Sequence, residues 1–75
     1  MSKASKFPCR TFGLAVRRQR EAIKLSQEDF AEKADVHRTY ISSIELGKVS
    51  VGIEVANKLA LALGMRLSEL VRSAE

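Results

Sequence analysis

The chain is poor in the residues that build metal sites, disulfides and chemical active sites. Its 75 residues include one cysteine, Cys9, and one histidine, His37. A structural zinc site takes four such ligands and a disulfide takes two cysteines, so one chain forms neither. No paired carboxylates at suitable spacing, catalytic triad or glycine-rich phosphate loop accompanies them. We therefore expect a protein that is not an enzyme and that holds no metal or other cofactor.

The chain also lacks long apolar runs and has few helix-breaking residues. No uninterrupted apolar stretch approaches the length of about 18 residues that a membrane span needs. Residues 1–6 are basic, but no apolar segment follows them, as a secretory signal would require. One proline and four glycines, with 45% hydrophobic residues, argue against disorder. These features favour one small cytoplasmic domain that makes no membrane contact.

Positive charge is concentrated at the start of the chain. Residues 1–24 hold seven lysines and arginines against Glu21 alone, whereas residues 25–75 hold six against eight acids. A basic end on a slightly acidic body is typical of a protein with a polyanionic partner, although a solvated surface gives the same pattern. We interpret residues 1–10 as a flexible basic arm and residues 11–75 as the folded domain.

Apolar residues recur at helical spacing along the folded part, and alternating strand patterns are absent. The pattern predicts five short helices: one that begins at Thr11 with Phe12, Val16 and Ile23 on one face, one from a Ser26 cap to about Ala34, one from Arg38 to about Leu46, one from a Ser50 cap to about Leu63, and a short last one containing Leu70 and Val71. Gly47 and Gly64 stand where left-handed helix stops are wanted. We expect a compact all-α bundle. Its predicted core residues are Phe12, Val16, Phe30, Ala31, Val36, Ile41, Ile44, Leu59, Leu63 and Leu70.

The second and third predicted helices form the most informative part of the chain. Ser26 is a strong N-cap, and Asp29 at the third helical position makes this start close to a capping box. Asp35-Val36 supplies a tight turn, because aspartate tolerates such turns well. The next helix opens with polar side chains that have no local structural task. Two helices of these lengths, joined by so short a turn, are typical of a helix-turn-helix.

Over about residues 12–71 the sequence resembles the phage-repressor and Cro-like helix-turn-helix regulators, also called the Xre type. The residues that carry the resemblance are Arg20, Leu25–Ala31, Ile41–Glu45, Gly47 and Leu59–Gly64. Within that family, His37–Ser42 is most similar to the small controller proteins of restriction–modification systems. The resemblance implies a lambda-repressor-like fold and a sequence-specific transcription regulator that binds double-stranded DNA without catalysis.

The resemblance also implies DNA contacts around the third helix. The residues that face base edges are Arg38, Thr39 and Ser43, with His37 at the lip of the groove. The residues that contact the DNA backbone are Gln27, Tyr40 and Lys48. A base contact by Arg38 is also chemically reasonable, because arginine can donate two hydrogen bonds to guanine. The alternatives are that His37 caps the third helix, that Tyr40 is a packing residue, and that the others are ordinary solvated side chains.

A different role is implied for Arg20 and Glu45. In the family the matching residues form a partly buried salt bridge between the first and third helices. We interpret this pair as structural, because it would set the angle of the third helix. Loss of one partner of a buried ion pair is expected to cost about 3–5 kcal/mol.

The end of the chain carries more apolar side chains than so small a core can bury. These residues are Leu61, Met65, Leu67, Leu70 and Val71. We predict that they form the interface of a homodimer, although core packing is the alternative for each of them. A twofold dimer would place the third helices of its two subunits, as recognition helices, about 34 Å apart on a palindromic operator.

A binding module that contacts protein rather than DNA is the competing interpretation. An antitoxin or a coactivator-type bridge has the same fold, and a bridge would tolerate the loss of Arg38 and Thr39, whereas a DNA reader would not. RNA polymerase is a further candidate partner, and no small-molecule effector is evident.

Overall fold

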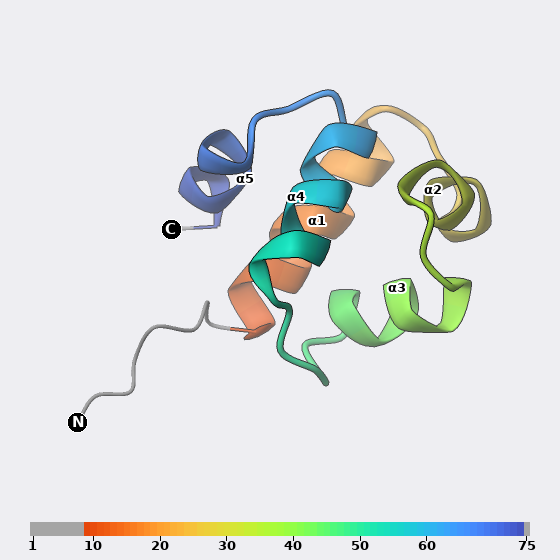
Figure 1. The fold of residues 1–75 in the computed structure, drawn as a ribbon, viewed down its shortest axis with the longest axis horizontal. Coiled ribbons are helices and arrows are strands. Elements are labelled where there is room, and N and C mark those ends of the chain that lie inside the picture. The colour runs from red at the N-terminus through yellow and green to blue at the C-terminus, as the bar shows by residue number, and fades with distance from the viewer. Residues whose placement is uncertain (1–8, 75) are drawn as a thin grey trace.

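The computed structural model describes residues 9–74, which form five α-helices and no strand. The helices are α1 (Cys9–Ala22), α2 (Gln27–Ala34), α3 (Arg38–Glu45), α4 (Ile53–Ala62) and α5 (Leu67–Ser73). In Figure 1, α1 and α4 lie across the middle of the molecule, with α2 and α3 on one side and α5 on the other. The predicted all-α fold is thus confirmed for these residues.

The core is one cluster of apolar side chains to which every helix contributes. Phe12, Phe30, Ile41, Leu59 and Leu70, one from each helix in chain order, are at most 1% exposed. All the predicted core residues are buried except the valine at position 36. That side chain packs against the cluster but is half-buried, because it lies in the turn between α2 and α3.

The first helix begins and ends earlier than the sequence pattern predicts. α1 starts at Cys9, so Thr11 lies inside the helix rather than at its N-cap, and the boundary proposed between residues 10 and 11 falls within α1. The helix ends at Ala22, so Ile23 lies beyond the helical repeat and is 44% exposed. Residues 1–8, most of the predicted basic arm, lie outside the described residues.

The fourth helix begins later than predicted. Its N-cap is Gly52, whose carbonyl accepts a hydrogen bond of 2.9 Å from the Ala56 backbone N–H, and not Ser50. A cap at Ser50 would have placed Val51 and Gly52 in the first turn, where a β-branched residue and a glycine are poor helix formers. Glycine is itself an accepted N-cap, so the later start is favoured.

Helix ends hold the helix-turn-helix unit in shape. The Ser26 hydroxyl accepts a hydrogen bond of 3.0 Å from the Asp29 backbone N–H, as predicted. Asp35 takes the left-handed conformation, with φ 60°, and the Val36 N–H then donates to the Ala31 carbonyl at 3.0 Å. This pattern is a Schellman ending, and it turns the chain from α2 into α3 within a few residues.

Candidate nucleic-acid interface

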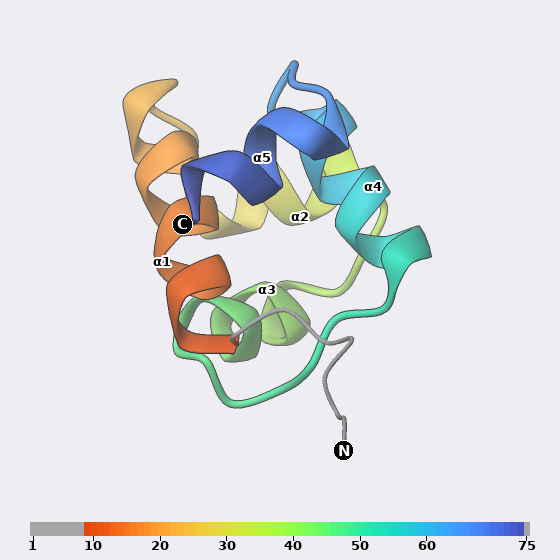
Figure 2. The ribbon, with the colours of Figure 1, turned by 90° about the vertical axis from the view of Figure 1, so that its left-hand side faces the viewer.

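α3 has a buried face and an exposed face. Ile41 and Ile44 are buried against the core, whereas Arg38 and Thr39 in the first turn are exposed. Ser43, one turn further along, is half-buried. Figure 2 shows α3 at the end of the molecule away from the loop that joins α4 to α5. The exposed polar side chains Arg38 and Thr39 therefore lie in the first turn of α3.

His37 is the N-cap of α3. Its Nδ1 accepts a hydrogen bond of 3.2 Å from the Thr39 backbone N–H and lies 2.8 Å from Thr39 Oγ1. The capping role, which the sequence offered as one alternative, is therefore present. The imidazole is exposed, so its other edge is free to face a ligand at the same time.

The predicted ion pair between Arg20 and Glu45 is present and buried. Arg20 Nε donates to Glu45 Oε2 at 2.7 Å, and Arg20 Nη2 donates to Glu45 Oε1 at 3.0 Å. Arg20 Nη1 also donates to the carbonyl of Leu25, just before α2, at 2.8 Å. This bidentate geometry is the strong form of an arginine–carboxylate pair. It joins α1, the approach to α2, and the last residue of α3.

Arg20 keeps its charge in the ion pair at neutral and moderately alkaline pH. The hydrogen bond with Glu45 raises the pKa of Arg20 above its ordinary value, against the opposing effect of burial. A raised pKa in the folded state means that the arginine's contribution to stability is complete below the unfolded-state value and is lost only as the pH rises past the folded one. The pair therefore orients α3 equally well at neutral and moderately alkaline pH.

Gln27 has a role that the sequence did not indicate. Its Nε2 donates a hydrogen bond of 3.0 Å to Glu45 Oε1, so the first residue of α2 is tied to the last residue of α3. The phosphate contact predicted for this side chain would use an amide that the structure turns toward Glu45. The backbone N–H groups at the start of α2 still favour an anion.

Gly13 has a structural role that the sequence pattern did not predict. A Cβ atom at this position would overlap the carbonyl oxygen of Ile44. α1 and α3 therefore approach each other so closely that only glycine fits at their crossing. A glycine inside an otherwise regular helical pattern was the available signal, because such a glycine usually has a packing reason.

The two remaining predicted contacts with the DNA backbone are Tyr40, inside α3, and Lys48, just beyond its end. Tyr40 is half-buried and packs against the core cluster, so its packing role is present. Lys48 is exposed and directly follows Gly47, which has φ 74°. The Lys48 N–H donates to the Ser43 carbonyl at 2.9 Å, which closes α3 with a second Schellman ending. The backbone of Lys48 is thus held just beyond the C-terminal end of α3.

A comparison with protein families matches the helix-turn-helix family to residues 16–70, from within α1 into α5. The chain belongs to the helix-turn-helix family. The matched range is more than half of the chain and contains α2, α3 and the turn between them.

Similar helix-turn-helix proteins indicate the kind of regulator. The control protein C.MunI from a Mycoplasma species is 46% identical over 57 residues, which cover 76% of this chain and 77% of that protein. The control protein C.BamHI from Bacillus amyloliquefaciens is 41% identical over 61 residues, covering 80% and 75%. The restriction-modification controller protein C.AhdI from Aeromonas hydrophila has a solved structure that superimposes with a TM-score of 0.78 at 37% identity, covering 80% of this chain and 91% of that one. This helix-turn-helix protein is a DNA-binding transcription regulator of the controller type and not an enzyme.

Two features were looked for in the part of this helix-turn-helix protein that the structure describes, and neither was found. Within residues 9–74, no group of three or more histidine, cysteine, aspartate or glutamate side chains could hold a metal ion. None of the helices in this range is both long and apolar enough to cross a bilayer.

The side chains predicted to form a dimer interface fall into three groups. Leu61 is 67% exposed on α4, and Met65, Leu67 and Val71 are half-buried. Leu70 is 0% exposed. The prediction is therefore wrong for Leu70, because α5 turns this side chain into the core and leaves none of it for a partner. The other four residues remain candidates.

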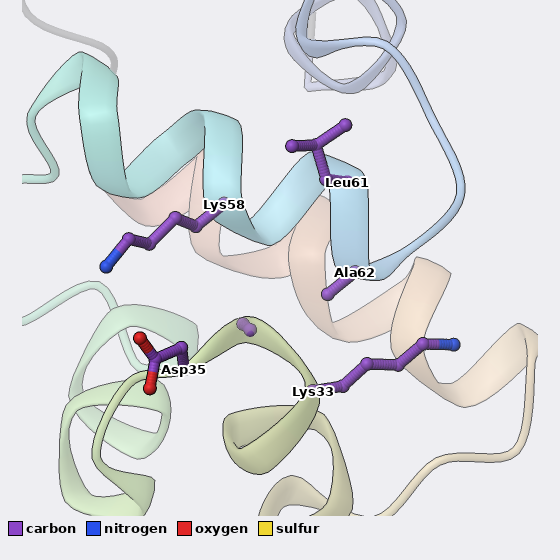
Figure 3. Close-up of a pocket in the computed structure, with 6 residues that line it drawn as sticks. Lys33, Asp35, Lys58, Leu61 and Ala62 are labelled. Carbon is purple, nitrogen blue, oxygen red and sulfur yellow. The ribbon is translucent and has the colours of Figure 1, made fainter.

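A surface pocket of about 300 Å³ lies between the end of α2 and α4 in this helix-turn-helix domain. Figure 3 shows Lys33 and Asp35 on one side and Lys58, Leu61 and Ala62 on the other. None of the predicted DNA-contacting residues lines it. Leu61 borders both this pocket and the predicted dimer surface.

Proposed function

We propose that the chain controls a restriction–modification system by binding a palindromic operator as a homodimer. In each subunit α3 acts as the recognition helix and lies in the major groove. Arg38 and Thr39 contact base edges, with Ser43 one turn away and His37 at the lip. Lys48 and Tyr40 contact the DNA backbone, and the N-terminal turn of α2 at Gln27 approaches a phosphate.

One observation carries this proposal above the others. The exposed start of α3 bears polar side chains, while its buried end is locked to α1 and α2 through Glu45. A bridge between proteins would not require this orientation of an arginine and a threonine at the first turn. A groove reader does require it, because base-edge hydrogen bonds depend on helix angle.

The dimer is supported by apolar side chains that remain accessible on α4, on α5 and in the loop between them. Leu61 is 67% exposed, and Met65, Leu67 and Val71 retain partial exposure. One recognition helix reads only half of a site, and a twofold axis through this surface would supply the second half. RNA polymerase, reached by a DNA-bound dimer, is the candidate further partner.

The deciding experiment is selection of bound duplexes from a random pool with the full chain. We expect enrichment of an inverted repeat whose half-sites are centred one helical turn apart, about 10 base pairs. Sedimentation of the free protein should show a dimer at micromolar concentration. Failure to enrich any duplex at low ionic strength would refute DNA reading, and a monomer that enriches an unrepeated half-site would refute the dimer alone.

A further inference from the structure

The hydrogen bonds at the start of α3 determine the direction in which the Thr39 hydroxyl donates. His37 Nδ1 lies 3.2 Å from the Thr39 backbone nitrogen and 2.8 Å from Thr39 Oγ1. A backbone N–H can only donate, so Nδ1 must present a lone pair to it. The proton of the neutral imidazole is then on Nε2.

The Thr39 hydroxyl consequently donates its one proton to His37 Nδ1. An unconstrained hydroxyl can donate or accept, and for this reason threonine ordinarily contacts either kind of base edge. Once its proton is engaged, Oγ1 has only lone pairs to offer. Both side chains are exposed, so Oγ1 can meet a base while the internal hydrogen bond persists.

We propose that this internal hydrogen bond makes Thr39 an acceptor-only reader, which selects adenine or cytosine at its position in each half-site. Adenine N6 and cytosine N4 are the amino donors in the major groove, whereas guanine O6 and thymine O4 are acceptors and would repel a second acceptor. His37 is therefore a positioning residue for specificity. Its own Nε2–H faces outward as a donor, suited to a phosphate oxygen. The inference rests on the proposed function, in which α3 enters the major groove.

Three variants of the full chain separate this role from a merely structural one. Thr39→Val removes the hydroxyl but keeps the shape, so it identifies the base position that Thr39 reads. His37→Gly removes the acceptor at little cost to the helix, because glycine is a good N-cap. His37→Asn restores an uncharged acceptor oxygen at the same N-cap. Each variant and the wild type are taken through selection on a library with randomised half-sites.

We expect the wild type to favour adenine or cytosine over guanine or thymine at one position per half-site, by about 2- to 10-fold, the effect of one hydrogen bond. Thr39→Val and His37→Gly should lose this preference at that position alone, and His37→Asn should keep it. The unchanged preferences at the other positions show that His37→Gly is folded and binds in the same register.

Several results would overturn the inference. These are a wild-type preference for guanine or thymine at that position, an unchanged profile for Thr39→Val, a preference that survives in His37→Gly, or one that His37→Asn also loses. If the proposed DNA-binding function were itself wrong, the result would differ, because the wild type would then select no sequence.

Discussion

Glu45 is the residue on which the orientation of α3 depends most. It is 6% exposed, and its two carboxylate oxygens accept hydrogen bonds from Arg20 on α1 and Gln27 on α2. A buried carboxylate is costly unless it is paired. Because both partners come from other helices, the pairing of this one charge also sets the relative positions of three helices.

Removal of Arg20 should therefore destabilise the fold strongly. We expect Arg20→Met to lower the free energy of unfolding by about 3–5 kcal/mol, because Glu45 is left buried without its counter-ion. Urea denaturation followed by circular dichroism measures the change. The double variant Arg20→Met/Glu45→Met, which leaves no unpaired charge, should recover most of the loss. A single variant as stable as the wild type would show that the pair does not hold α3.

Arg38 and Lys48 should differ in the kind of DNA binding that they support. Arg38→Ala should relax base preference at one position per half-site, with a loss of about 1–3 kcal/mol against the preferred base. Lys48→Ala should weaken binding to all duplexes and reduce the slope of log affinity against log salt by about one unit. Titrations at several salt concentrations, on the selected operator and on a scrambled duplex, measure both. Identical changes in the two variants would contradict the assigned roles.

At the level of the helices, Gly13 determines how closely α1 and α3 approach. In an exposed helix, replacement of glycine by alanine would add about 1 kcal/mol of stability. Here we expect Gly13→Ala to destabilise by about 1–3 kcal/mol and to weaken DNA binding, because the methyl group must push α3 away at Ile44. Thermal unfolding and operator titration measure the two effects.

The matched control is Gly52→Ser. A Cβ atom at this position has nothing within 4 Å, and serine is a preferred N-cap for α4. This variant should keep full DNA binding and wild-type or higher stability. A Gly13→Ala variant that is more stable than the wild type would show that α1 and α3 can separate freely.

The sequence predicted the helices well where local signals were strong, and less well where two signals competed. The serine at position 26 is followed by good helix formers, and α2 begins as expected. Near Ser50 two N-cap candidates stand two residues apart, and the residues that follow each one decided the outcome. Ile23 matched the helical repeat, but Lys24 adopts a left-handed conformation and the helix has already ended.

In the candidate site, the sequence predicted the ion pair that orients α3, but not the other contacts that hold this helix. The resemblance to known regulators placed Arg20 opposite Glu45, and the structure contains that pair. The hydrogen bond from Gln27 to Glu45 and the close crossing at Gly13 depend on how helices meet in space, and no local pattern contains that information. Leu70 was predicted both as a core residue and as a dimer-interface residue, because an apolar side chain on a short helix suits either place. Only the packing of α5 shows that it belongs to the core.

For the whole molecule, assembly should depend on Leu61, an exposed apolar side chain near the end of α4. We expect Leu61→Asp to sediment as a monomer and to lose affinity for the full operator, because a charge would be buried at the twofold interface. Its unfolding temperature at low protein concentration should be unchanged, since Leu61 is 67% exposed.

Ile53→Asp is the control for this experiment. It places the same charge on the same helix at a residue that is 69% exposed and lies outside the predicted interface. This variant should remain a dimer. If both variants dimerise like the wild type, the interface lies elsewhere on the molecule.

The separation between the exposed start of α3 and its locked end has an evolutionary consequence. The hydrogen bonds that hold the helix in place use Arg20, Gln27 and Glu45, and none of these is an exposed side chain of the first turn. If α3 reads DNA as proposed, substitutions at Arg38 or Thr39 would thus alter target choice without unfolding the scaffold. Descendants of such a protein could diverge in the promoters they recognise while inheriting one unchanged architecture.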